Sequence, residues 1–259
     1  MIITKKGISL CKRIYRFSSV ESTMKIASSL AKEGAPEGTV IIAEEQTKGK
    51  GRAGHYWFSP KGGLYLSVIL RPLFSSSYLS KLSLMGAIGI VKSIREIAPS
   101  LPSKIRWPND AVIEKRKIGG VLLEARRENN KVCFVIMGIG VNLNIEEFPF
   151  PLSLTATSLK KELGHSISLK DFLLTLFEKL EDLYSSFQKD FPSFLEEIYL
   201  FSSLMGEQVK LRNENEELNG QVQGIDEEGN LILRLESGLQ KRISPEKGFI
   251  VNEFSNRRW

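Results

Sequence analysis

Glycines and cations gather in one segment of the chain, Gln46 to Arg71, which reads QTKGKGRAGHYWFSPKGGLYLSVILR. Closely spaced glycines let backbone N–H groups approach a ligand, and Lys48, Lys50 and Arg52 add positive charge beside them. This combination suits polyphosphate, or a phosphate and a carboxylate held together. The alternative is a solvent-exposed basic loop without a ligand, which is the commoner case among loops.

Two familiar phosphate motifs do not fit this loop. Gly49-x-Gly51-x-x-Gly54 matches the dinucleotide fingerprint by letter, but that motif needs a helix at its third glycine and an acidic residue about 20 positions later. Here Leu64 to Leu70 alternates apolar and polar residues and predicts a strand, while Arg71 stands near the expected acid. A Walker loop is excluded as well, because no Gly-Lys-Ser/Thr follows.

Composition narrows the classes of protein without identifying one. The 259 residues carry a formal net charge of +6, which favours anionic ligands or partners. Their number suits one large domain, or a large and a small one. A histidine-rich metal site is excluded by the presence of only two histidines. Two distant cysteines and no signal-like N-terminus predict a cytoplasmic protein, and no apolar run approaches the ~20 residues of a membrane span.

Hydrophobic periodicity and capping residues predict the elements around the glycine loop. A short helix starts at a cap, Ser22 or Thr23, and ends at Gly34. A longer helix with Ser168 as its N-cap covers Leu169 to Gln188. The other predicted segments are a strand at Val40 to Ala43, a helix at Tyr78 to Ala98, strands at Lys104 to Trp107, Ala111 to Ile113, Lys117 to Arg126 and Val132 to Val141, and a helical segment at Phe191 to Gly206.

Short strands replace this pattern after Gly206. The segments VKLR, GQVQGID, NLILRLE and QKRISP are typical of strands, and GIDEEGNL predicts a hairpin turn. About 50 residues of this kind predict a small antiparallel barrel appended to an α+β body. We therefore expect an α+β domain at residues 1–204 and a barrel domain at residues 205–259.

Four separated motifs occur in one order along the chain. They are Glu21-Ser22-Thr23, Gln46 with GKGRAGHYWFS, Arg106-Trp107-Pro108-Asn109-Asp110 with Lys117-Ile118-Gly119-Gly120, and Gly138-Ile139-Gly140-Val141-Asn142. This set resembles a biotin protein ligase of the short class, which lacks the N-terminal DNA-binding domain of the bifunctional repressors. The resemblance covers nearly the whole chain and implies that residues 1–204 form a mixed-sheet catalytic domain of the biotin/lipoate ligase type, followed by a C-terminal SH3-like β-barrel.

The resemblance implies a two-step ligase reaction. Biotin and ATP form biotinyl-5'-adenylate and pyrophosphate, and a lysine of a biotin carboxyl carrier protein then takes the biotinyl group as an amide. A carboxylate must approach a polyanion in the first step, so fixed cations and Mg²⁺ have to cancel their repulsion. Arg52 and Lys117 match the family's catalytic cations. By composition alone, Lys117 would be one more exposed base in EKRK.

The same resemblance assigns binding roles position by position. Each has a structural alternative: a helix cap for Ser22 and Thr23, a core position for Trp57, and a tight turn for Asn109 and Asp110. Asp110 is also the candidate to orient Mg²⁺ through the phosphates. The implied biotin contacts are Ser22, Thr23, Gln46, Lys50, Gly51, Arg52 and Lys117, and the implied nucleotide contacts are Gly49, Trp57, Asn109, Asp110 and Asn142.

Three positions depart from the family's usual residues. Lys50 stands where the loop usually has an arginine, which preserves a backbone contact but not a bidentate one. His55 takes the place of a further arginine, and Arg106 replaces the usual lysine before Trp107.

Rival readings remain beside the ligase. A lipoate–protein ligase shares the fold and the acyl-adenylate chemistry, although its loop does not usually carry GxGRxG. The positive charge and Arg257-Arg258 would suit a nucleic-acid-binding regulator, but the sequence contains no recognisable nucleic-acid-binding motif. A catalytically inactive scaffold conflicts with the presence of Arg52 and Lys117. Dimerisation occurs in the family, so a homodimer is a further expectation.

Overall fold

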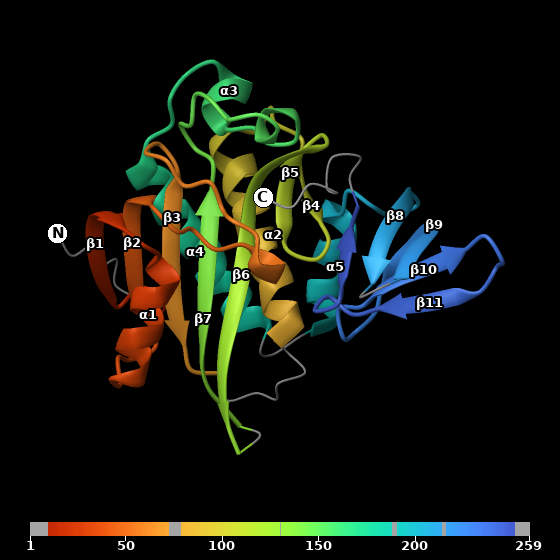
Figure 1. Cartoon of the computed structure of the whole chain (residues 1–259), viewed down its shortest axis with the longest axis horizontal. Coiled ribbons are helices and arrows are strands. Elements are labelled where there is room, and N and C mark those ends of the chain that lie inside the picture. The colour runs from red at the N-terminus through yellow and green to blue at the C-terminus, as the bar shows by residue number, and fades with distance from the viewer. Residues whose placement is uncertain (1–9, 73–78, 130, 188–190, 214–215, 252–259) are drawn as a thin grey trace.

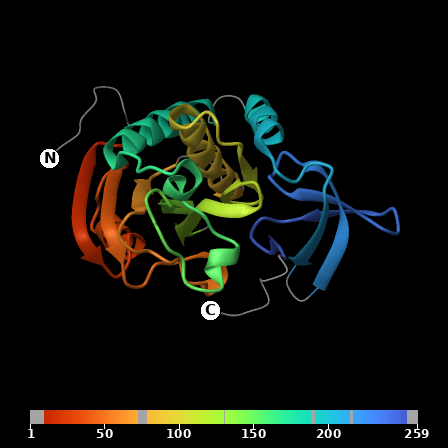
Figure 2. The ribbon, with the colours of Figure 1, turned by 90° about the horizontal axis from the view of Figure 1, so that it is seen from above.

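The computed structural model describes residues 10–72, 79–129, 131–187, 191–213 and 216–251. A large mixed sheet with helices on both faces forms the body of the molecule, and a smaller antiparallel sheet from the C-terminal part lies at one end of it (Figures 1 and 2). This arrangement confirms the predicted α+β class.

The large sheet has seven strands in the order β1-β2-β3-β7-β6-β5-β4. Of the described strand pairs in it, β1 and β2 run parallel and the others are antiparallel. The strands in chain order are β1 (Arg13–Val20), β2 (Thr39–Gln46), β3 (Leu64–Leu70), β4 (Ser103–Arg106), β5 (Asp110–Ile113), β6 (Arg116–Glu128) and β7 (Lys131–Val141).

Helices bury the two faces of this sheet. Helix α1 (Thr23–Lys32) covers one face, while α2 (Leu79–Ile97) and α4 (Leu169–Phe187) cover the other, and α5 (Phe191–Phe201) packs beside α2 and α4 (Figure 1). Strand β3 is consequently buried along all seven residues. The apolar–polar alternation expected of β3 therefore gives it no solvent-exposed face.

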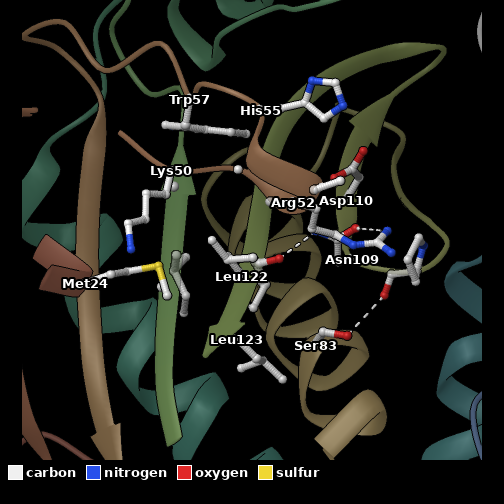
Figure 3. Close-up of a pocket in the computed structure, with 18 of the residues that line it drawn as sticks. Met24, Lys50, Arg52, His55, Trp57, Ser83, Asn109, Asp110, Leu122 and Leu123 are labelled. Atoms are coloured by element: carbon white, nitrogen blue, oxygen red, sulfur yellow. Dashed lines mark hydrogen bonds between the residues drawn. The ribbon is translucent and has the colours of Figure 1, made fainter. Parts of the chain in front are cut away.

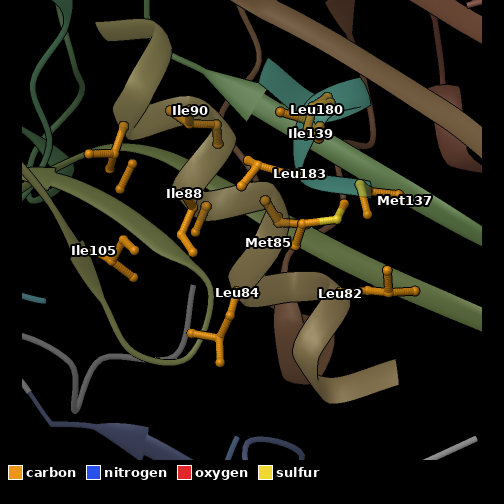
Figure 4. Close-up of a cluster of buried hydrophobic side chains, with 14 of the residues drawn as sticks. Leu82, Leu84, Met85, Ile88, Ile90, Ile105, Met137, Ile139, Leu180 and Leu183 are labelled. Carbon is orange, nitrogen blue, oxygen red and sulfur yellow. The ribbon is translucent and has the colours of Figure 1, made fainter. Parts of the chain in front are cut away.

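The main core lies between the sheet and the two long helices. Figure 4 shows Met85 and Ile88 of α2 beside Met137 and Ile139 of β7. Helix α4 approaches α2 closely at Gly89, where an added Cβ would lie 2.7 Å from Leu180 Cδ2. Such dense packing makes the position of the sheet relative to the helices rigid.

The predicted cap of α4 is confirmed, since Ser168 Oγ accepts a hydrogen bond from the backbone N–H of Asp171 at 3.3 Å. The predicted cap of α1 is wrong in one respect. Ser22 occupies the N-cap position, but its side chain makes no capping hydrogen bond. The polar site described below explains where that hydroxyl lies instead.

The C-terminal sheet is antiparallel, as expected, with five strands in the order β11-β10-β9-β8-β12. The last strand was not expected from the sequence, because Gly248–Ile250 is too short to show a period. The division of the chain at residues 204 and 205 stays a prediction. These strands are β8 (Gln208–Asn213), β9 (Glu216–Ile225), β10 (Leu231–Leu235), β11 (Gln240–Ile243) and β12 (Gly248–Ile250).

Trp107 joins the two sheets. It is 2% exposed, and its Nε1 donates a hydrogen bond to the carbonyl of Gly229 at 3.0 Å. A Cβ added at Gly248 would lie 2.9 Å from Trp107 Cη2, so the C-terminal sheet approaches the ring closely. This contact brings residues 245–249 beside the cavity above the large sheet, which is described below.

Candidate active site

A cavity of about 810 Å³ opens above the middle of the large sheet (Figure 3). Ten of the twelve residues with predicted roles line it, drawn from six separate parts of the chain. The structure thus brings together motifs that are far apart in sequence. The ten are Ser22, Thr23, Gln46, Lys50, Gly51, Arg52, Trp57, Asn109, Asp110 and Lys117.

A buried polar cluster forms one end of the cavity. Gln46 Oε1 accepts hydrogen bonds from the backbone N–H of Thr23 at 2.9 Å and from its Oγ1 at 3.1 Å. Gln46 Nε2 donates to Ser59 Oγ at 3.1 Å, and Thr23 Oγ1 lies 2.8 Å from Ser67 Oγ. Ser22 Oγ is buried there without a hydrogen-bond partner among the described residues. An unpaired buried hydroxyl is costly, so this atom is suited to a polar ligand group.

The floor of the cavity is formed by strand backbone rather than by side chains. A Cβ at Gly140 of β7 would lie 2.6 Å from the Trp57 ring, and one at Gly138 would lie 2.7 Å from Met24 Sδ. Both glycines therefore let these side chains lie directly on the sheet (Figure 3). Leu66, Val121, Leu122 and Ile139 add apolar side chains to the lining.

Asp110 and Lys117 line the other end, beside the turn Trp107-Pro108-Asn109-Asp110 (the WPND turn), and Arg106 pairs with Asp110 without lining the cavity itself. Asp110 stands between two cations, with its Oδ1 2.6 Å from Lys117 Nζ and its Oδ2 3.0 Å from Arg106 Nη2. Burial acts to raise the pKa of Asp110, but Lys117 and Arg106 outweigh it and hold that pKa below its usual range. Lys117 Nζ also lies 4.9 Å from the centre of the Trp57 ring, within range of a cation–π contact.

Arg52 reaches from the glycine loop to the C-terminal part of the chain. Its Nη1 donates to Asn109 Oδ1 at 3.3 Å, and its Nη2 donates to the carbonyl of Gly248 at 3.2 Å and to that of Pro245. Burial lowers the pKa of this guanidinium, and the charge of Asp110 opposes the shift. The three acceptors are neutral, so Arg52 is a largely buried cation among uncharged oxygens.

Two predicted residues do not line the cavity. Gly49 lies behind the loop, where an added Cβ would be 2.3 Å from the carbonyl oxygen of Trp57. Asn142 is buried, and its Nδ2 donates to the carbonyl of Thr157 at 3.0 Å. Both positions hold neighbouring backbone in place, and the nucleotide contacts implied for them stay predictions.

Comparison with known proteins identifies the family to which the chain belongs. The Biotin/lipoate A/B protein ligase family model matches residues 16–142, and the Biotin protein ligase C terminal domain model matches residues 204–244. The bifunctional ligase/repressor BirA of Bacillus subtilis (strain 168) is 36% identical over 233 residues, which is 88% of this chain and 71% of that protein. The chain belongs to the biotin protein ligase family.

Other members of the family agree in sequence and in structure. The biotin–[acetyl-CoA-carboxylase] ligase of Paracoccus denitrificans is 29% identical over 209 residues, covering 77% of this chain and 85% of that one. The biotin protein ligase of Aquifex aeolicus, solved in complex with biotin and ATP, superposes with a TM-score of 0.82 at 29% identity. That match covers 93% of this chain and all of that one.

The loop of this family member forms a tight turn at the cavity. The Gly51 N–H donates to the carbonyl of His55 at 2.7 Å, and Ala53 and Gly54 have positive φ angles of 52° and 78°. Lys50, which stands in place of the usual arginine, pairs with Glu124 of β6 at 2.9 Å. The loop is thus tied to the far wall through the lysine side chain as well as through its backbone.

Residues near the C-terminus of the chain also line the cavity, and no sequence motif predicted this position for them. Pro245, Glu246, Lys247 and Phe249 stand more than 120 residues beyond Lys117 and match none of the four motifs. Met24 and Leu122 were missed too. Both are apolar residues beside recognised motifs. Only the alternation of side chains along β6 for Leu122, and the position of Met24 at the start of α1, could have indicated that they face the cavity.

None of the helices in the described part of the chain is long and apolar enough to cross a membrane. Within the same part of the chain, no three His, Cys, Asp or Glu side chains are grouped so that they could hold a metal ion.

Proposed function

We propose that this member of the biotin protein ligase family activates biotin with ATP as biotinyl-5'-adenylate and transfers it to a lysine of a biotin carboxyl carrier protein. One observation carries the proposal: a single cavity joins a polar cluster, an apolar floor and a buried cationic end. Those three regions fit a ureido ring, the body of biotin with its alkyl chain, and a carboxyl–phosphate junction. The names of its relatives support it: a bifunctional ligase/repressor in B. subtilis, a biotin–[acetyl-CoA-carboxylase] ligase in P. denitrificans and a biotin protein ligase in A. aeolicus.

The cationic end serves the first step. A biotin carboxylate oxygen attacks the α-phosphorus of ATP, the new P–O bond forms, and the bond to pyrophosphate breaks. Arg52 and Lys117 both line this end of the cavity, where negative charge gathers during the reaction. A charged phosphate oxygen makes a stronger hydrogen bond to a guanidinium than a neutral carbonyl does. Arg52 therefore gains when an anionic ligand replaces one of its neutral acceptors.

The second step needs fewer groups from this chain. The uncharged amine of the carrier lysine attacks the acyl carbon, a C–N bond forms, and AMP leaves as the lysine nitrogen loses its proton. The cavity walls exclude water, which would otherwise hydrolyse the mixed anhydride. Arg52 and Lys117 retain the adenylate through this step by their contacts to its phosphate.

Mg²⁺ belongs to the proposal as a companion of the triphosphate. Mg²⁺ is commonly bound by one or two carboxylates together with substrate phosphates, and Asp110 is the carboxylate at the cationic end. Both oxygens of Asp110 are already paired with cations. We therefore propose that phosphate oxygens supply most of the ligands and that Asp110 orients the ion indirectly, through the phosphates.

The polar cluster favours biotin over lipoate. Gln46 is fixed by Thr23 and Ser59, and the buried Ser22 hydroxyl needs a partner. A ureido ring offers both a carbonyl and N–H groups to such a cluster, whereas a dithiolane ring offers neither. A site built to hydrogen-bond a polar group rejects an analogue that lacks it.

A direct assay tests the function. The protein is incubated with ATP, Mg²⁺, biotin and a carrier domain, and the carrier is weighed by mass spectrometry. We expect the mass increase of one biotinyl group, with AMP and pyrophosphate as products. A parallel reaction with lipoate should leave the carrier unchanged, and melting curves should rise with biotin only. Lipoyl transfer, or no transfer with either acid, would contradict the proposal.

Two accompanying proposals concern the cellular compartment and the oligomeric state. Cys11 and Cys133 are both free thiols, which agrees with a reducing cytoplasm. The homodimer implied by the family stays a prediction, and sedimentation with and without biotin and ATP would measure it.

A further inference from the structure

We propose that Arg106 is a positioning residue for adenylation, which holds the carboxylate of Asp110 so that Lys117 can leave it for the phosphate. The inference rests on the proposed function. Arg106 is not among the cavity-lining residues and touches no reacting atom in this arrangement. Its effect must therefore pass through Asp110.

The geometry of the WPND turn sets up this relay. Arg106 ends β4, Asp110 begins β5, and the two residues are paired across the turn. Arg106 Nη2 lies 3.0 Å from Asp110 Oδ2, and the two side chains are only 13% and 16% exposed. Arg106 Nη1 also donates to the carbonyl of Lys115 at 3.4 Å. The guanidinium is thus anchored at two points and leaves Asp110 Oδ1 turned toward Lys117.

Electrostatics explains why a second cation is needed. Asp110 is buried, and a buried carboxylate without a partner is strongly unfavourable. If Lys117 were its sole partner, moving the ammonium to a phosphate would leave that carboxylate unpaired, and Asp110 would hold Lys117 back. Because Arg106 occupies Oδ2, Asp110 remains paired when Lys117 moves. The group of Arg106, Asp110 and Lys117 also keeps one net positive charge for the incoming polyanion.

An ordinary structural ion pair is the competing account. Arg106 would then only stabilise the turn, and its loss would weaken biotin binding, ATP binding and folding together. Asp110 separates the two accounts. If Arg106 acts through the charge of Asp110, neutralising that carboxylate removes the reason for Arg106.

A double-mutant cycle tests the inference. Wild type, Arg106→Gln, Asp110→Asn and the double variant are compared by biotin-dependent ATP–pyrophosphate exchange, with biotin affinity measured by calorimetry. Misplacing a catalytic group costs roughly 10- to 100-fold in rate, and we expect a loss of that order in kcat for Arg106→Gln with biotin affinity unchanged. The double variant should be no slower than Asp110→Asn, because the two sites are coupled.

Two results would overturn the inference. One is a double variant whose loss is the product of the two single losses, since Arg106 would then act independently of Asp110. The other is an equal fall in biotin affinity and exchange rate for Arg106→Gln. If Arg106→Gln does not fold, the same cycle is run with Arg106→Lys, whose smaller loss must also vanish beside Asp110→Asn. Failure of the wild type to exchange pyrophosphate with biotin would instead contradict the proposed function.

Discussion

Arg52 and Lys117 are the two cations on which the proposed adenylation depends, and their surroundings differ. Arg52 is buried among neutral oxygens of Asn109 and the C-terminal part of the chain. Lys117 already has an anionic partner in Asp110. A ligand phosphate therefore adds a charged partner to Arg52 but has to compete with a carboxylate for Lys117. Substitutions at the two positions should therefore impair different properties of the enzyme: retention of the adenylate at Arg52, and the rate of adenylation at Lys117.

Arg52→Gly should weaken retention of the adenylate more than binding of biotin alone, because the carboxyl–phosphate end is present only in the former. The lost charge-assisted contacts are worth on the order of 2 kcal/mol or more. Calorimetry with biotin and with a non-hydrolysable adenylate analogue measures the difference. Lys48→Gly in the same loop is the control, because Lys48 is exposed and lies outside the cavity. Equal losses for the two ligands would refute the role given to Arg52.

Lys117→Ala should lower the rate of pyrophosphate exchange at saturating substrates, since the removed cation meets charge that develops in the transition state. Little change in stability was expected from an exposed turn, and the structure corrects that expectation. The Lys117 side chain is 29% exposed and pairs with buried Asp110, so its loss should also lower the melting temperature. Lys115→Ala, at an exposed neighbour, is the matched control. Normal exchange by Lys117→Ala would leave Lys117 as a purely structural ion-pair partner.

Most of the site could be predicted at this scale because its residues occur in short motifs. Ser22, Gln46, Arg52 and Lys117 all line the cavity, as the resemblance implied. Side-chain partners could not be predicted. The sequence suggested a capping side chain for Ser22 and an exposed base for Lys117. In the structure the Ser22 hydroxyl is buried without a capping bond, and Lys117 is largely covered and paired with Asp110.

At the scale of elements, periodicity predicted most strands and helices within a few residues, but not β1 or the short helix Leu159–Leu163. The bounds of β6 and β7 extend the predicted strands by only a few residues at their ends. Strand β12 was missed because three residues show no periodicity. The loop between β2 and β3 could be recognised by its composition. Its sharp turn at Ala53, where φ is positive, could not be predicted from the residue types.

Limited proteolysis tests whether this loop closes over the ligand. Trypsin should cut after Lys48 and Lys50 without ligand, because the ion pairs that hold these side chains are exposed and weak. Arg52 is only partly exposed and its guanidinium is held by three carbonyl oxygens, so it should be cut more slowly. Biotin with ATP should slow all three cuts, while cleavage after Lys32 at the exposed end of α1 should not change. Ligand-independent cleavage of the loop would show that it is not the lid.

At the scale of the whole molecule, the two sheets share one site. No local pattern could reveal this, because Trp107 and Gly229 stand 122 positions apart, and Arg52 and Pro245 stand 193 apart. The four matched motifs all end by Asn142, so none of them lies in the C-terminal part. That part nevertheless supplies one wall of the cavity.

A chain that ends at Met205 should therefore lose adenylation and not only transfer to the carrier. It lacks both carbonyl partners of Arg52 and exposes the buried ring of Trp107. Trp107→Phe in the full chain is the control. It should lose about 1–3 kcal/mol of stability by leaving the Gly229 carbonyl unpaired, yet keep the wall of the cavity. If the shortened chain folds and biotinylates the carrier at the full rate, the C-terminal part is dispensable.

The glycine floor of the cavity limits how this binding site can change over evolution. At Gly138 and Gly140, any substitution adds atoms, so single mutations there can shrink the space but cannot enlarge it. Room for a bulkier acid has to come from trimming Met24, Leu122 or Trp57. Selection for a new substrate would therefore meet a one-sided choice, with volume removed at the strands and gained only at the walls.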